Sequence, residues 1–245
     1  MPVPPPSPAG DGQPGGVVPV TSSAAMRLTP ADIDVLRFVG RCRFATVPQV
    51  ARWAGRTEKK IYPRLLGMRS HELVEFHRPL NERGVYVATR AGLAVAGLDL
   101  PPARIDLATF THDRLVADLA VSLETAGMGV VTEREMRHSD ESPDTLDDGG
   151  PRYAVVLPTG GRHYPDLLAV TPSGHYQAVE VELTPKNLAR RQRILAGYAR
   201  ARHIETVTYH VTNPTVGDLV RRSAAQLGIT DLIEVRPLTQ AGVAA

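Results

Sequence analysis

Three acidic residues in two neighbouring apolar segments have the types and spacing of a metal site. Asp166 follows Pro165 in HYPDLLAV, and Glu180 and Glu182 alternate with valines in HYQAVEVEL. Alternate side chains of a strand share one face, so Glu180 and Glu182 project together, and Asp166 joins Glu180 if the two strands pair. Burying these carboxylates together is unfavourable unless a cation offsets their repulsion and desolvation. We therefore expect Asp166 and Glu180 to bind Mg²⁺ or Mn²⁺, an arrangement that activates water against phosphodiesters.

The same acids also have a purely structural interpretation. Asp166 would cap a turn after Pro165, and Glu180 and Glu182 would face water from an edge strand, because the EVE of AVEVEL is ordinary half-exposed alternation. Their order and spacing, and the helix predicted to follow, favour the metal site.

Four further residues lie near these acids in the predicted arrangement. Glu124 and Glu133 could each add a metal ligand, although a solvated glutamate at a helix end is the more common role for Glu124. His163 and His175 match no ligand spacing, and we expect both to be surface histidines at strand ends.

The elements that must position the acids alternate between helices and strands. A helix capped by Thr111 places Val116, Leu119, Ala120 and Leu123 on one stripe that would pack on a sheet. Strands are predicted at 130–136, 153–157, 163–170, 175–183, 205–212 and 232–235, with helices at 186–202 and 214–227. Residues 105–238 are therefore expected to form an α/β domain with a mixed sheet.

Positive charge is concentrated elsewhere, in residues 27–98. This range holds 13 Lys/Arg and 6 Asp/Glu, a difference of +7, although the whole chain has a formal net charge of +2. Such a basic range is typical of a polyanion-binding domain, because neutralised phosphates release condensed counterions. Double-stranded DNA is the predicted partner. Solvated surface charge, or a protein contact, is the alternative interpretation.

Local signals in residues 26–99 predict three short helices, then a hairpin, then a fourth helix. N-cap signals stand at Thr29, Thr46, Thr57 and Thr89. Two apolar segments within 72–89 join around NERG, which predicts the hairpin. This order resembles the winged helix-turn-helix families, in which the third helix enters the major groove and the hairpin wing contacts phosphates. The DNA-contacting cations would then be Arg56, Lys59, Lys60 and Arg64 at the third helix and Arg83 at the wing tip.

The acidic segments resemble a known family as well. Pro165-Asp166, a hairpin and Glu180-x-Glu182 on a helix-first core resemble the PD-(D/E)xK nuclease fold, which is restriction-endonuclease-like, over residues 111–236. With the upstream helices, residues 27–236 resemble the replication-relaxation proteins of plasmids, phages and other bacterial mobile elements. Their Pro-Asp strand and Glu-x-acid-x-Thr segment correspond to Pro165, Asp166, Glu180, Glu182 and Thr184. The resemblance implies an α+β protein of two domains that acts in replication or relaxation of such DNA.

Glu182 departs from the nuclease pattern, in which that position is usually a lysine that orients the attacking water. Lys186 could supply the cation from a shifted position, so the expected catalytic set is Asp166, Glu180, Glu182 and Lys186. The domain is either an active metal-dependent endonuclease or a relict of one. The helix predicted to follow carries Arg190 and Arg191, and no acidic residue lies between Leu183 and Ile204. This positive charge favours contact with the phosphate backbone of DNA.

Two other functions stay open. The chain could be a transcriptional regulator whose α/β domain dimerises or senses a ligand, or an architectural DNA binder. A homodimer, or a partner from a replication machinery, would fit either a regulator or a replication protein.

The composition also indicates the cellular compartment of such a protein. The single cysteine, Cys42, excludes an internal disulfide and is expected to be a packing residue in a reducing cytoplasm. No apolar stretch is long enough for a membrane span, and no secretory signal is evident, so no membrane partner is expected. Residues 1–25, rich in Pro, Gly and Ser, are predicted to be a disordered tail, and 138–151 a disordered acidic loop.

Overall fold

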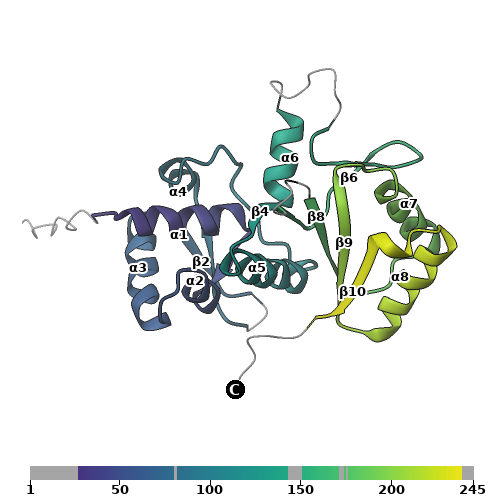
Figure 1. The fold of residues 1–245 in the computed structure, drawn as a ribbon. Helices are drawn as coiled ribbons and strands as arrows, with labels where there is room; N and C mark the ends of the chain where they lie inside the picture. The colour runs from purple at the N-terminus through teal and green to yellow at the C-terminus, as the bar shows by residue number, and fades with distance from the viewer. Residues whose placement is uncertain (1–26, 80–81, 143–150, 171–173, 175, 239–245) are drawn as a thin grey trace, which may run out of the picture.

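The computed structural model describes residues 27–79, 82–142, 151–170, 174 and 176–238, and within them it is an α+β protein with eight α-helices and mixed sheets (Figure 1). The predicted tail, residues 143–150 of the predicted acidic loop and His175 lie outside these residues. The start of that predicted loop is wrong, because residues 138–141 belong to helix α6 (Glu133–Glu141). None of the helices in the described ranges combines the length and apolarity needed to cross a membrane.

The N-terminal helices begin where the sequence predicts. Helix α1 (Pro30–Arg41) starts behind Thr29, whose hydroxyl accepts a hydrogen bond from the Asp32 amide. Helix α2 (Val47–Trp53) has the same arrangement at Thr46, and α3 (Glu58–Ser70) follows Thr57. Their apolar sides form one core, which includes the buried side chains of Leu36, Phe38, Val50, Leu65 and Met68.

The predicted hairpin is confirmed as strands β2 (Val74–His77) and β3 (Val85–Ala88), which pair antiparallel. A two-residue strand, β1 (Ala45–Thr46), joins the other edge of β3, and helix α4 (Arg90–Val95) follows Thr89. Both faces of β3 are buried, because Tyr86 packs on the helical core while Val85 and Val87 pack against Phe110.

The second sheet has five strands in the order β10-β9-β8-β7-β4. Their bounds are Gly129–Thr132 for β4, Leu167–Val170 for β7, Tyr176–Glu182 for β8, Ile204–Val211 for β9 and Ile233–Pro237 for β10. The β4–β7 and β7–β8 pairs are antiparallel, whereas β8–β9 and β9–β10 are parallel. Strand β8 therefore lies at the centre of a mixed sheet.

Helices cover both faces of this sheet. Helix α5 (Phe110–Thr125) packs on one face through Ala120, which meets Leu167 and Val179. Helices α7 (Leu188–Tyr198) and α8 (Pro214–Gln226) pack on the other face, where Leu195 and Val220 belong to the second large core. The remaining elements are α6 (Glu133–Glu141), β5 (Val155–Val156), β6 (Arg162–His163) and the short 3₁₀ helix η3 (Thr230–Leu232).

Four predicted elements were wrong in their bounds, and one of them is the helix predicted at 186–202, which spans only Leu188–Tyr198. The segment 130–136 is not one strand, because Thr132 and Glu135 form a capping box that starts α6 at Glu133. The segment 163–170 is divided between β6 and β7, and Pro165, which has no amide hydrogen to donate, lies between them. Helix α5 is capped by Thr109 rather than Thr111.

The expected boundary near residue 100 is crossed by extensive packing. Ala117 and Val121 of α5 belong to the same apolar core as α1, α2 and α3. Arg41, at the end of α1, pairs with Glu124 and Glu135, with 2.8 Å between the paired atoms in each case. The Trp53 indole also donates to Glu124 at 2.5 Å. The two parts of the chain are therefore joined by a partly buried polar network as well as by apolar contact.

Candidate functional site: the acids of strand β8 and the cations of helix α3

Strand pairing places the predicted acids on adjacent strands at the centre of the sheet. Leu167 pairs with Val179, so Asp166, one residue before β7, stands at the register position opposite Glu180. Glu180 and Glu182 are only 4% and 5% exposed. The interpretation in which they face water from an edge strand is therefore wrong.

Glu180 is held by two residues from outside its strand. His163 Nε2 lies 2.6 Å from Glu180 Oε1, and the Tyr198 hydroxyl of α7 donates to the same oxygen. Burial raises the pKa of the Glu180 carboxyl, but His163, Lys186 and Tyr198 together outweigh it and hold that pKa below its usual value. His163 was expected at the surface, and its pairing with Glu180 corrects that expectation.

Asp166 has its own partners on the opposite side of the strand. Its carboxylate accepts a hydrogen bond from the Val181 amide at 2.7 Å and lies 3.2 Å from His112 Nε2. Burial raises the pKa of Asp166, and the neighbouring charge of Glu180 adds to this, while His112 opposes it.

His112 of α5 was not identified from the sequence, because no spacing links it to the acids. Its two ring nitrogens face Asp113 at 3.3 Å and Asp166 at 3.2 Å. Burial alone would lower the pKa of His112, but the two carboxylates raise it to about 10. At neutral pH, the His112 side chain is therefore protonated and positively charged, and it lies between two acidic residues.

Glu182 pairs with Lys186, which lies in the segment leading from β8 to α7. Burial lowers the pKa of Lys186, and the positive charge of Arg190 lowers it further, while Glu180 and Asp166 offset part of this change. Lys186 therefore lies near the acids, as a shifted motif lysine would, but its ammonium is committed to Glu182.

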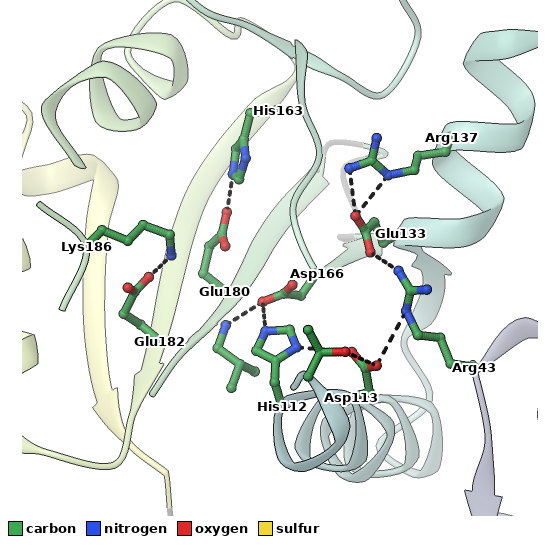
Figure 2. Close-up of polar contacts among 12 residues, drawn as sticks. Arg43, His112, Asp113, Glu133, Arg137, His163, Asp166, Glu180, Glu182 and Lys186 are labelled. Carbon is green, nitrogen blue, oxygen red and sulfur yellow. Dashed lines mark hydrogen bonds and ion pairs between the residues drawn. The ribbon is translucent and has the colours of Figure 1, made fainter. Parts of the chain in front are cut away.

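These partners leave the carboxylates turned away from one another (Figure 2). Asp166 faces His112, Glu180 faces His163, and Glu182 faces Lys186. Magnesium is usually held by one or two carboxylates together with waters, and two carboxylates that share one ion must point toward it. Within the described residues, no group of three or more His, Cys, Asp or Glu side chains is arranged to hold a metal ion. In this arrangement Asp166 and Glu180, the two predicted metal ligands, each pair with a histidine and do not converge on one point.

A chain of ion pairs connects Asp166 to the N-terminal part of the protein (Figure 2). Arg43, which follows α1, lies 3.7 Å from Asp113 and 2.9 Å from Glu133. Glu133 also pairs with Arg137 at 2.8 Å. Glu124 and Glu133, which could each have added a metal ligand, both pair with arginines.

The cations predicted for DNA contact occupy the exposed side of α3 and its leading turn. Arg56, Lys59 and Lys60 are exposed, and none has an ion-pair partner within the described residues. Tyr62 and Leu66 share the exposed side of α3 and are 49% and 39% exposed. The helix therefore presents both charge and apolar surface to solvent.

Two of the predicted DNA-contacting arginines serve the fold instead. Arg64 donates to both carboxylate oxygens of buried Asp32, from Nε at 2.8 Å and from Nη2. Arg191 is buried between α7 and α8, where it donates to Ser223 Oγ and to the Lys186 carbonyl, each at 2.8 Å. Arg83 and Arg190 are exposed, as expected.

No protein-family model matches this chain, and no curated protein matches it.

Proposed function

We propose that this chain is a DNA-binding protein, in which residues 27–98 act as a winged helix-turn-helix and α3 enters the major groove. The observation that carries the proposal is the exposure of Arg56, Lys59 and Lys60 without acidic partners in the described part of the chain. Nearby arginines of the same segment, such as Arg41 and Arg64, are neutralised within the protein. Positive charge that the chain leaves unneutralised favours a polyanion outside it.

The remaining surface of α3 suits contact with bases. In the proposed complex, Lys59 and Lys60 contact phosphates of the DNA backbone. Tyr62 and Leu66 lie in the major groove, next to the edges of the bases. Apolar side chains in the major groove recognise the methyl group of thymine. Arg83, exposed beside strand β3, would reach the flanking backbone as part of the wing.

The C-terminal part is proposed to be a nuclease-like domain that has kept the fold and lost the reaction. The resemblance to replication-relaxation proteins suggests that DNA binding serves replication or relaxation of a plasmid or phage. Lys186 and His112, which balance Glu182 and Asp166, favour a structural role for the acids.

Binding of a fluorescent duplex of about 20 base pairs with mixed sequence, measured by anisotropy over a range of salt, tests the proposal. Arg56→Ala/Lys59→Ala/Lys60→Ala should weaken binding by at least about 10-fold. Each lost phosphate contact should also reduce the slope of log K against log salt by about 0.9. Three lost contacts would therefore reduce it by roughly 2 to 3.

Two control proteins separate this effect from net charge and from folding. Arg37→Ala/Arg221→Ala/Arg236→Ala removes the same number of exposed cations, each paired with an acid in the native chain, and should bind normally. Arg64→Ala should lower stability by about 1 to 2 kcal/mol, because buried Asp32 loses its partner, with little effect on DNA affinity. Equal loss of binding in the Arg37 triple variant, or none in the α3 variant, would contradict the proposal.

A further inference from the structure

Helix α7 and the turn after it carry a second set of cations that the proposed function does not use. Arg190, Arg193, Arg200 and Arg202 are exposed, and none has an ion-pair partner within the described ranges. The sequence from Thr184 to His203 contains no acidic residue. The neighbouring surface of α8 and β10 differs, because Arg221 pairs with Asp218 at 2.9 Å and Arg236 with Glu234 at 2.7 Å.

The arginines lie on the side of α7 that is not packed against the sheet. Ala189, Arg193, Ala196 and Arg200 follow one another at helical spacing along this side, while Ile194, Leu195 and Tyr198 are buried against the sheet. Arg200 lies in the turn just after α7, seven residues beyond Arg193, and at the helical rise this separation is about 10 Å. One DNA strand presents a phosphate about every 3.4 Å along the helix axis, so this length matches about three phosphates. The small alanines allow a backbone to approach the helix closely.

The placement of these charges works against the helix itself. The first turn of α7 contains Arg190 and Arg191 and no acid, although the amino-terminal end of a helix favours negative charge. Arg190 also lies close enough to Lys186 to disfavour its protonated form. A bound anion would remove both unfavourable interactions.

The second set is far from the first. Figure 1 shows α3 and α7 at opposite ends of the molecule, with α5 and the five-stranded sheet between them. We propose that the exposed side of α7 binds the phosphate backbone of a second DNA segment, so that one protein molecule joins two duplexes. This inference rests on the proposed function, because α3 must hold the first duplex.

A two-duplex capture experiment tests the proposal with the full chain. One duplex of about 15 base pairs, about 50 Å long, is immobilised, and recovery of a second, fluorescent duplex is measured with and without protein. Arg190→Gln/Arg193→Gln/Arg200→Gln should keep affinity for a single duplex within about 2-fold and reduce recovery of the second duplex by at least about 10-fold. The control Arg221→Gln/Arg222→Gln/Arg236→Gln removes three charges from neighbouring α8 and β10 and should recover the second duplex normally.

The outcomes distinguish this inference from the proposed function. If the wild-type protein binds one duplex but never recovers the second, or if the α7 variant recovers it as well as the wild type, the inference is overturned. Recovery that persists in the α7 variant and depends on α3 alone would mean that two protein copies do the joining. If the wild-type protein binds no DNA, the proposed function fails, and the inference fails with it.

Discussion

The α3 surface and the β8 acid cluster concentrate charge in opposite ways. On α3, Lys59 and Lys60 are exposed and form no ion pair within the described structure. Around β8, Glu180 and Glu182 are buried, and each has a partner from the protein. Exposed charge that the chain leaves unneutralised is available to an external partner, whereas a buried charge that loses its partner destabilises the fold. The comparison predicts large effects on stability at β8 and small ones at α3.

The largest effect is expected at Lys186. Lys186→Met leaves Glu182 as an unpaired buried carboxylate, which should lower the free energy of unfolding by about 3 to 5 kcal/mol in urea titrations. The double variant Glu182→Gln/Lys186→Met removes both charges and should recover more than half of that loss. A cost below about 0.5 kcal/mol for Lys186→Met, the range of ordinary surface changes, would show that the pair is no more than surface charge.

A smaller, pH-dependent effect is expected at His112. Its folded-state pKa of about 10 is above its ordinary value of 6.5, so the folded protein holds this proton more tightly than the unfolded chain. The resulting stabilisation is complete below pH 6.5 and is lost as the pH rises through 10. His112 is partly exposed, so solvent screening reduces the roughly 4 kcal/mol that these pKa values imply at pH 7, and His112→Asn should cost about 2 kcal/mol there. The variant should also flatten the decline in stability between pH 7 and pH 10. Parallel pH profiles for the wild type and the variant would count against a cationic His112.

The smallest effect is expected from divalent metal. Because His112, His163 and Lys186 already satisfy the three carboxylates, Mg²⁺ or Mn²⁺ at about 10 mM should leave the Tm unchanged to within about 1 °C. Supercoiled plasmid should likewise stay supercoiled in the presence of protein and metal. Nicking by the wild-type protein that disappears in Asp166→Ala would contradict the structural role of the β8 acids and would identify the acid cluster as a catalytic site.

The sequence was most informative where structure depends on neighbouring residues. Thr29, Thr46 and Thr89 each begin a helix as predicted, because a cap depends only on the next three residues. The hairpin of β2 and β3, and the pairing that sets Asp166 opposite Glu180, were also predicted correctly. Helix α6 was missed although its signal was present, since Thr132 and Glu135 form a capping box.

The partners of charged residues could not be predicted in the same way. Arg64 and Lys60 have equivalent positions in the helical pattern, but only Arg64 meets Asp32, which α1 brings from 32 residues away. His112 and His163 reach Asp166 and Glu180 only because α5 and β6 pack beside β8. Whether a charge is neutralised depends on tertiary packing, which short-range spacing does not encode.

The contacts of Arg41 have a consequence for DNA geometry. Arg41 holds Glu124 of α5 and Glu135 of α6 together, and Trp53 of α2 binds the same Glu124. These bonds, and the shared apolar core, leave little freedom for a hinge between the two ends of the molecule. Under the two proposals, the protein is therefore a rigid spacer: the gap between the joined duplexes is set by the protein fold and not by a linker.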